Sequence, residues 1–362
     1  MKIHLIAAAR PNFMKIAPLF HELDKRDWAD PIIVHTGQHY DLNMSDIFFK
    51  NFGLPEPHIH LGVGSGTHAQ QTGNVMIAYE KILLENPPDL VVVVGDVNST
   101  VAATLAAVKL GVKVAHLEAG LRSFDRTMPE EINRLVTDAI ADYLWTPSLD
   151  GNQNLENEGV RPEKICLVGN IMIDSLVMAR KNIEMLDVYS GLGCKRGEFG
   201  LVTLHRPSNV DNRDGLALLC EHLVAISKKI PLIFPVHPRT FGKLKEFGIE
   251  VLNEAENIHL TDPLGYNDFM NLVFNSRLII TDSGGVQEET TYLKIPCITL
   301  RENTERPVTV TQGTNQLCRP EELEKKVDLI LEGRFKKGSI PEFWDGKTAQ
   351  RIADLIQRLS RD

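Results

Sequence analysis

The segment from Asp282 to Glu289, which reads Asp-Ser-Gly-Gly-Val-Gln-Glu-Glu, could bind an anion. It follows a short apolar run and opens a stretch with a helical pattern, so backbone N–H groups and the positive end of a helix dipole would face a ligand there. Gly284 and Gly285 would let a phosphate approach the main chain, and the Glu289 carboxylate could hold a ribose diol. The segment therefore predicts a nucleotide diphosphate site, with an ordinary helix start capped by Ser283 as the alternative.

Acidic side chains gather in the first half, where buried strands are expected to end. Asp96 and Glu118 each follow an apolar run, and Glu130 and Glu131 come directly after Pro129 at a helix start. Carboxylates that crowd together can serve as proton donor and acceptor near neutral pH. The pattern therefore favours acid–base chemistry, although the helix dipole alone would explain the two adjacent glutamates.

Cationic side chains and histidines also follow strands. Arg10 ends the first strand and Lys15 lies one helical turn further on, so the pair could clamp a phosphate. His205 and His237 end two strands of the second half and could donate hydrogen bonds to a phosphate. A structural role is the alternative for each lone histidine. The first strand lacks the G-x-G-x-x-G dinucleotide signature, and no G-x-S-x-G hydrolase elbow occurs.

Composition limits the class of protein. The chain has 362 residues, 43% hydrophobic and 24% charged, which is typical of a soluble globular protein with two domains. A formal charge of −9 argues against a nucleic-acid partner, and no apolar run reaches the length of a membrane span. Five scattered cysteines indicate a reducing cytoplasm rather than a disulfide framework. His35 and His39 have metal-like spacing but no third ligand, so we expect no metal and no cofactor.

Short apolar runs alternate with helical patterns throughout the chain. We expect strands at Lys2–Ala8, Pro31–Thr36, Asp89–Val94, Lys113–Leu117, Tyr143–Thr146, Lys164–Val168, Gly200–Leu204, Pro231–Val236, Asn257–Leu260, Arg277–Thr281 and Pro296–Thr299. We expect helices at Phe13–Lys25, His68–Glu85, Ser99–Lys109, Glu130–Ala141, Leu216–Lys229 and Thr348–Leu359. Strands that are apolar throughout are covered on both faces, which predicts doubly wound parallel sheets.

The periodic pattern weakens between Leu186 and Phe199, and we place the interdomain region near Gly169 to Gly197. The expected first domain comprises residues 1–172 plus 347–362, because the last helix would pack back on it, and the second comprises residues 173–346. Ligands of such α/β domains bind at the carboxyl ends of the strands. We therefore expect the active site in a cleft between two Rossmann-like domains.

The ordered motifs resemble those of the non-hydrolysing UDP-N-acetylglucosamine 2-epimerases. Matching stretches in the first half are Ala9–Pro18, Gly37–His39, Gly95–Thr100, His116–Arg122, Pro129–Arg134 and Val168–Asn170. Matching stretches in the second half are Thr203–Arg206, Pro235–Pro238, Asp282–Glu289 and Thr304–Pro307. The resemblance implies a GT-B-like fold, a homodimer, and reversible conversion of UDP-GlcNAc to UDP-ManNAc. It also implies elimination of UDP, a 2-acetamidoglucal intermediate and re-addition, supplying ManNAc-type sugars for surface polysaccharides.

The resemblance also implies roles for individual residues. Asp96, Glu118 and Glu130 would be the acid and base, with Glu131 as the second choice, and His205, Arg10 and Lys15 would lie near UDP and the reacting sugar. Ser283, Gly284, Gly285 and Glu289 would hold diphosphate and ribose, Arg306 would add a nucleotide contact, and Leu264 and Phe269 would frame uracil.

Two departures from the family pattern bear on regulation. The common bacterial His-Arg-Arg-Glu-Asn stretch is here His205-Arg206-Pro207-Ser208-Asn209, and the helix at 70–82 lacks an arginine with which some members bind a second, activating UDP-GlcNAc. Gln38 and His237 keep part of that second site. We therefore expect that substrate is not required as an activator.

Three other functions fit parts of the sequence. A related epimerase would act on a UDP-2,3-diacetamido sugar, and a GT-B glycosyltransferase would donate from a UDP-sugar. A non-catalytic nucleotide-sugar sensor would need the diphosphate site without the acids. Inverting sugar transfer needs one base, so the joint presence of Asp96, Glu118 and Glu130 favours the epimerase.

Overall fold

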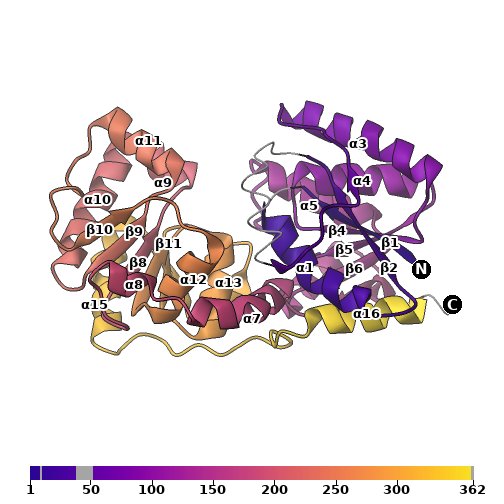
Figure 1. The fold of residues 1–362 in the computed structure, drawn as a ribbon. Coiled ribbons are helices and arrows are strands. Elements are labelled where there is room, and N and C mark those ends of the chain that lie inside the picture. Colours follow the sequence, from indigo (N-terminus) through magenta and orange to yellow (C-terminus); the bar gives the residue numbers. More distant parts are fainter. Residues whose placement is uncertain (9, 38–51, 360–362) are drawn as a thin grey trace. The chain divides into compact units, whose positions relative to one another are not determined.

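The computed structural model describes residues 1–8, 10–37 and 52–359, with only the backbone of Arg10 (Figure 1). The chain forms two compact units, Met1–Met178 with Glu342–Asp362 (unit 1) and Ala179–Pro341 (unit 2). It passes from unit 1 to unit 2 within helix α7 (Ile171–Glu184). No helix of the described residues is long and apolar enough to cross a membrane.

Unit 1 contains a seven-stranded sheet with the order β3-β2-β1-β4-β5-β6-β7, in which all pairs are parallel. Its strands are β1 (Lys2–Ala7), β2 (Asp30–His35), β3 (Ile59–His60), β4 (Leu90–Val94), β5 (Lys113–Leu117), β6 (Tyr143–Thr146) and β7 (Ile165–Leu167). Strand β4 is entirely buried, as its unbroken apolar sequence predicts.

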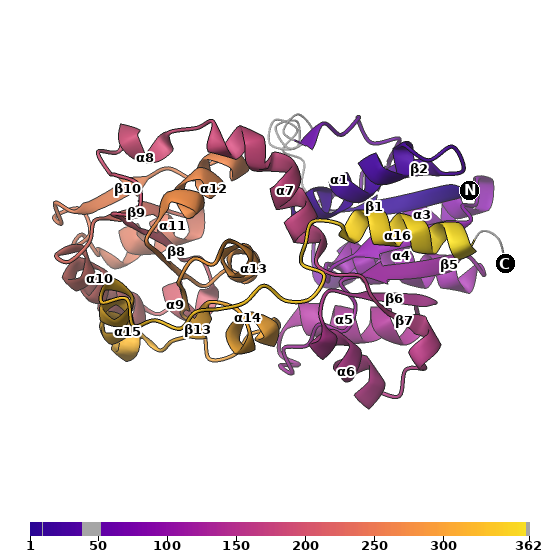
Figure 2. The same cartoon turned by 90° about the horizontal axis from the view of Figure 1, so that it is seen from below.

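Helices cover both faces of this sheet. Among the described residues, the helices of unit 1 are α1 (Arg10–Asp24), α3 (His68–Glu85), α4 (Asn98–Lys109), α5 (Pro129–Ile140), α6 (Leu149–Asn157), the first part of α7, and α16 (Thr348–Leu359). Helices α3 and α4 lie on one face, and α1 and α16 pack together on the other (Figures 1 and 2). Helix α16 therefore belongs to unit 1.

Unit 2 repeats the architecture around a six-stranded parallel sheet with the order β10-β9-β8-β11-β12-β13. The strands are β8 (Gly200–Thr203), β9 (Leu232–Pro235), β10 (Ile258–Thr261), β11 (Leu278–Thr281), β12 (Cys297–Thr299) and β13 (Asn315–Leu317). The helices are α8 (Val188–Gly191), α9 (Pro207–Val210), α10 (Arg213–Ser227), α11 (Pro238–Phe247), α12 (Tyr266–Asn275), α13 (Gly284–Leu293), α14 (Pro307–Thr311) and α15 (Leu323–Leu331).

The predicted α/β class is confirmed, and each predicted strand is present with ends that shift by about one residue. Helix α10 begins earlier than its apolar pattern suggested, because the Asn212 side chain caps it by accepting a hydrogen bond from Gly215 N. The prediction missed β3 and β13. Both are short edge strands, and Asn315-Gln316-Leu317 contains no apolar run that could reveal it.

Gly120 should be far less tolerant of a side chain than Gly111, although both have a positive φ, +78° and +75°. A β-carbon on Gly120 would lie 2.4 Å from the Gly151 carbonyl oxygen, whereas one on Gly111 would meet no atom within 4 Å. We expect Gly111→Ala to lower the free energy of unfolding by about 1 kcal/mol through backbone strain, and Gly120→Ala to cost at least about 2 kcal/mol more. Equal losses in denaturant unfolding would contradict this packing.

Candidate functional site

A buried ion pair lies at the carboxyl end of strand β5. Lys15 Nζ on α1 is 2.5 Å from Glu118 Oε2, and both side chains are almost fully buried. Glu118 directly follows β5 and has a φ of +73°, a left-handed conformation that costs energy for a residue with a side chain. Its Oε1 is buried without a hydrogen-bond partner among the described residues. One oxygen of Glu118 is therefore paired with a cation, and the other has no partner in the described part of the chain.

Asp96 lies in the turn that follows the neighbouring strand β4. Its Oδ2 accepts hydrogen bonds from Arg134 Nε at 3.0 Å and Nη2 at 2.5 Å, and its carbonyl oxygen accepts one from Asn133 Nδ2 at 2.9 Å. Both donors are on α5, so this helix orients the carboxylate. The side chain is 30% exposed, and solvent can reach it.

The turn that carries Asp96 packs against the Lys15–Glu118 pair. Gly95 has a φ of +68°. A β-carbon at this position would lie 3.2 Å from Lys15 Nζ and 3.6 Å from Glu118 Oε2. The structure therefore places the turn that carries Asp96 beside Glu118 and Lys15, at the carboxyl ends of β4 and β5.

The two glutamates at the start of α5 have different environments. Glu131 is buried and accepts hydrogen bonds from Ser123 N, Ser123 Oγ, Phe124 N and Arg134 Nη1 at 2.7 to 3.0 Å. Burial alone would raise the pKa of Glu131, but these donors hold the pKa below its ordinary value. Glu130 is partly exposed and has no side-chain partner in the part of the chain that the structure describes. These contacts favour Glu130 over Glu131 as a group that could exchange a proton.

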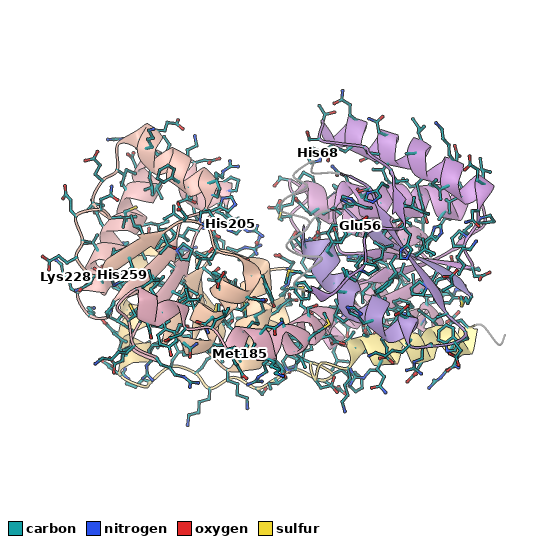
Figure 3. The ribbon with its side chains drawn as sticks, in the orientation of Figure 1. Glu56, His68, Met185, His205, Lys228 and His259 are labelled. Atoms are coloured by element: carbon teal, nitrogen blue, oxygen red, sulfur yellow. The ribbon has the colours of Figure 1, made fainter. Side chains whose placement is uncertain are left out.

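In unit 2 a buried aspartate holds the loop after β8. Asp282 is fully buried and accepts hydrogen bonds from His205 N, Arg206 N and Asn209 Nδ2 at 2.8 to 3.2 Å. Its Oδ1 is also 2.9 Å from Nδ1 of His205. Figure 3 labels His205. Burial would raise the pKa of Asp282, but His205 and the backbone N–H groups hold it below its ordinary value. Asp282 therefore fixes the orientation of the His205 ring, which is 37% exposed.

Helix α13 begins directly after this aspartate. Ser283 occupies the N-cap position, but its side chain makes no capping hydrogen bond. A β-carbon on Gly285 would meet no atom within 4 Å, so the main chain is open there. The first N–H groups of a helix lack partners within the helix and favour an anion. This geometry is suited to the predicted diphosphate contact.

A network of buried charges lies beside Gly284. Arg306 Nη1 is 2.7 Å from Glu305 Oε1, and Arg306 Nε is 2.8 Å from Glu288 Oε1. Arg301 Nη2 is 2.7 Å from Glu305 Oε2, and Arg301 Nη1 has no hydrogen-bond partner among the described residues. A β-carbon on Gly284 would lie 2.8 Å from Arg306 Nη1, so the glycine leaves room for this network. Two arginines thus adjoin the helix start, of which only Arg306 was predicted.

Glu289 is buried on the second turn of α13. Its Oε1 accepts a hydrogen bond from the Tyr266 hydroxyl at 3.1 Å. Burial raises the pKa of Glu289 to about 8 in spite of this hydrogen bond. The two residues predicted to frame uracil, Leu264 and Phe269, flank Tyr266 in sequence and are half-buried. The predicted ribose and uracil residues therefore share one region of unit 2, joined by Tyr266.

Several predicted residues lie outside the described part of the structure. These are the Arg10 side chain, Gln38 and His39. Sequence reasoning had no role for Arg134, Tyr266 or Arg301, and it named Asp282 only as the start of a segment. Arg134, Tyr266 and Asp282 contact the predicted residues Asp96, Glu289 and His205. Arg301 contacts Glu305, which also contacts the predicted Arg306. The apolar pattern of the sequence does not reveal such side-chain contacts.

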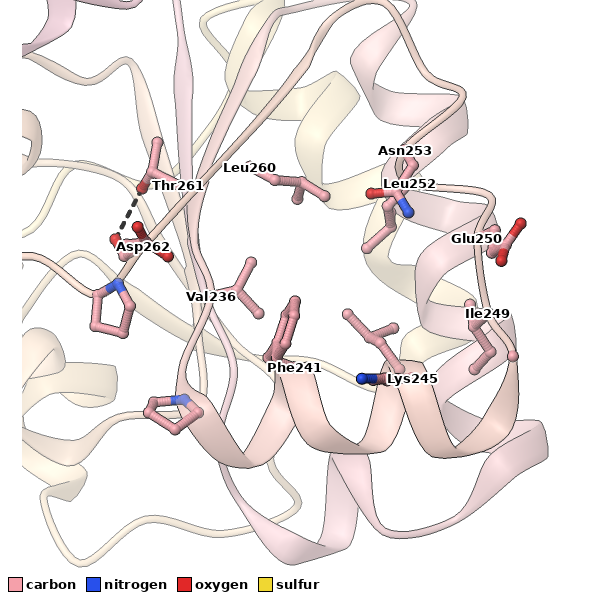
Figure 4. Close-up of a pocket in the computed structure, with 14 residues that line it drawn as sticks. Val236, Phe241, Lys245, Ile249, Glu250, Leu252, Asn253, Leu260, Thr261 and Asp262 are labelled. Carbon is pink, nitrogen blue, oxygen red and sulfur yellow. Dashed lines mark hydrogen bonds between the residues drawn. The ribbon is translucent and has the colours of Figure 1, made fainter.

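One cavity in unit 2 contains none of the predicted site residues (Figure 4). Its volume is about 830 Å³, and it lies between α11 and β10. The apolar part of its lining is formed mainly by Val236, Phe241, Leu244, Leu252 and Leu260. No cluster of acids and bases lines it, so the candidate chemistry lies elsewhere.

Comparison with known proteins decides the family. The profile of the UDP-N-acetylglucosamine 2-epimerase family matches residues 21–357. A UDP-N-acetylglucosamine 2-epimerase of Methanocaldococcus jannaschii is 44% identical over 98% of this chain and 99% of its own length. This chain belongs to the UDP-N-acetylglucosamine 2-epimerase family. The family resemblance inferred from the motifs is therefore confirmed.

Further relatives show the fold and the range of named activities. The crystal structure of the M. jannaschii UDP-GlcNAc 2-epimerase in complex with UDP-GlcNAc and UDP has a TM-score of 0.89 at 43% identity, covering 99% of this chain and 100% of that one. The predicted GT-B-like fold is thereby confirmed. A UDP-2,3-diacetamido-2,3-dideoxy-D-glucuronate 2-epimerase of Pseudomonas aeruginosa is 39% identical over 99% of this chain and 100% of its own length. Relatives that are named for two different substrates therefore match this chain, so family membership alone does not decide between these substrates.

The raised pKa of Glu289 should appear in the pH dependence of stability. The folded-state pKa is about 8 against an ordinary value of 4.5, so between these pH values the folded protein binds more protons than the unfolded chain. The Glu289 contribution is therefore present below about pH 4.5 and is lost as the pH rises through about 8. As the pH rises from 5 to 8, wild type should lose the Glu289 contribution to its free energy of unfolding, whereas Glu289→Gln has none to lose. The difference between the two proteins should therefore shift in favour of Glu289→Gln by on the order of a few kcal/mol.

Denaturant unfolding at the two pH values measures this difference, and Glu254→Gln, at an exposed position, serves as the control. A pH dependence that is the same in Glu289→Gln as in wild type would show that Glu289 titrates normally.

Proposed function

We propose that this protein reversibly converts UDP-N-acetylglucosamine to UDP-N-acetylmannosamine by inverting C2. The observation that carries the proposal is the arrangement of Asp96, Glu118 and Lys15 at one sheet edge, in a chain that belongs to this family. When two carboxylates have different partners, one of them can hold a proton while the other is ionised. A sensor or a single-base transferase would not need this arrangement.

The reaction needs help from the leaving group. The C2 hydrogen has no adjacent carbonyl to acidify it, so a carboxylate removes the C2 proton as the bond between C1 and the UDP oxygen breaks. The electron pair of the C2–H bond becomes the C1–C2 double bond of 2-acetamidoglucal, and UDP leaves with the electron pair of the C1–O bond. A second acid then protonates C2 from the opposite face while the UDP oxygen adds back to C1. The atoms and charges balance without a cofactor.

Each unit supplies groups for a different part of the substrate. We assign Asp96, Glu118 and Glu130 to proton transfer at C2, and Lys15 to the charge balance of Glu118. We assign the start of α13, His205 and Arg306 to the diphosphate, where cations and N–H groups stabilise the departing UDP. Glu289 receives the ribose diol, and Leu264 and Phe269 flank the base. Arg10 keeps its predicted role near the phosphate.

One relative indicates a second candidate substrate. The P. aeruginosa relative, at 39% identity over nearly the full chain, is named for a UDP-2,3-diacetamido glucuronate. The two substrates differ at C3 and C6, whereas the chemistry at C2 is the same. Proton NMR of the purified protein with each sugar nucleotide separates them. We expect UDP-ManNAc from UDP-GlcNAc; conversion of only the diacetamido substrate would contradict our choice.

The proposal also covers the cellular compartment and the oligomeric state of the protein. All five cysteines are free thiols, which fits the reducing cytoplasm that we infer for this protein. We also propose a homodimer, and sedimentation equilibrium would then give twice the mass of the chain. A single-chain mass at micromolar concentration would refute this assembly.

Asp96→Asn should remove turnover while leaving the nucleotide site intact. The amide keeps an oxygen for Arg134 but cannot carry the proton, so we expect kcat to fall by at least about 100-fold. The affinity for UDP should stay within about tenfold, because Asp96 is not among the groups assigned to UDP. Coupled turnover assays and calorimetry measure the two quantities, and Asp24→Asn on the exposed end of α1 is the control. Wild-type kcat in Asp96→Asn would exclude Asp96 from proton transfer.

A further inference from the structure

A histidine and an aspartate form a fully buried pair behind the candidate carboxylates of unit 1. His116 is on β5 and Asp138 on α5, and neither side chain is exposed to solvent. His116 Nδ1 is 2.5 Å from Asp138 Oδ1, and His116 Nε2 is 2.9 Å from the carbonyl oxygen of Gly95. A carboxylate and a carbonyl are both acceptors. Each ring nitrogen must therefore donate, and a ring with a proton on both nitrogens satisfies both contacts.

The surrounding charges favour an ionised Asp138. Arg122 Nη1 is 2.7 Å from Asp138 Oδ2, and Arg122 in turn binds Glu158 through two hydrogen bonds of 2.7 Å. Burial raises the pKa of Asp138, but the charges of His116 and Arg122 hold it below its ordinary value. These contacts form an alternating row of charges, from His116 through Asp138 and Arg122 to Glu158, in which each cation has an anion beside it.

The pair contacts both loops that carry candidate acid–base groups. Through His116 it binds the carbonyl of Gly95, the residue directly before Asp96. Through Asp138 Oδ2 it accepts the N–H of Gly120 at 3.0 Å, two residues after the strained Glu118. A buried ion pair is a costly way to fill a core, because well-packed apolar residues of similar size are often at least as stable. Its place between the two loops therefore suggests a purpose other than stability.

We propose that His116, doubly protonated and paired with Asp138, is a positioning residue that fixes the turn at Gly95 and thereby the carboxylate of Asp96. This inference rests on the proposed function, since it assigns Asp96 to proton transfer. His116 does not touch the substrate. A displacement of about 1 Å in a reacting group can cost about 100-fold in rate, so loss of the Gly95 contact should appear in kcat.

Two substitutions of His116 separate positioning from stability. The amide of glutamine reaches the place of Nε2, so His116→Gln keeps a donor for Gly95 and loses the Asp138 contact. The amide of asparagine reaches the place of Nδ1, so His116→Asn keeps the Asp138 contact and loses Gly95. Both variants remove the ring and its charge. We expect similar losses of thermal stability, with kcat about 100-fold lower in His116→Asn and within about tenfold of wild type in His116→Gln.

The affinity for UDP should be unchanged in both variants, because neither His116 nor Asp96 is among the groups assigned to UDP. Equal kcat values in the two variants, or kcat values that follow their melting temperatures, would overturn the positioning role. If the wild-type protein converts neither sugar nucleotide, the proposed function is wrong. The protonation of the His116 ring is tested by a separate experiment.

That separate test is nitrogen NMR of the wild-type protein labelled at histidine. We expect the His116 ring to show two N–H groups at pH 7.5, and Asp138→Asn to reduce them to one. The asparagine oxygen would still accept from Gly120 N, while its amide would donate to a neutral ring. A wild-type ring with a single N–H at pH 7.5 would contradict the proposed pair.

Discussion

The loops at the carboxyl ends of the parallel strands need fixed partners for their polar groups, and in each unit a buried aspartate provides them. Asp138 binds Gly120 N directly and Gly95 O through His116 in unit 1. Asp282 binds the backbone N–H groups of His205 and Arg206 in unit 2. Each aspartate also contacts a histidine ring and is deeply buried, where an unpaired charge would be costly. The candidate site residues depend on these two carboxylates for their positions.

Tight positioning explains how the site can hold unfavourable features. Glu118 keeps a left-handed backbone and a buried oxygen that has no partner among the described residues, both of which cost free energy. The Lys15 ion pair offsets part of this cost, and the Asp138 contact to Gly120 holds the following backbone. In unit 2, Glu289 is buried with a raised pKa beside Tyr266. Such groups persist because the surrounding packing determines their conformation.

The positions of residues just after predicted strands identified candidate site residues. Only contacts between elements showed how the environments of these residues differ. Apolar runs located the strands, and the residues just after them included Asp96, Glu118 and Asp282. The strand and helix pattern alone could not separate Glu130 from Glu131, because both follow Pro129. In the structure only Glu131 is buried and bonded to Ser123, Phe124 and Arg134. The sequence also could not reveal Asp138 or Arg134, which lie inside a helical pattern and matter through the side chains they contact. The short strand β13 was missed because its polar sequence has no periodicity.

The central claim is that carboxylates of unit 1 exchange a proton at C2 of a UDP-sugar, and incubation with UDP-GlcNAc in deuterated water tests it most directly. If the claim is correct, NMR will show UDP-ManNAc with deuterium at C2, and deuterium will also enter the recovered UDP-GlcNAc. Formation of UDP-ManNAc that keeps the original hydrogen at C2, or tight binding of UDP with no exchange at all, would contradict the account.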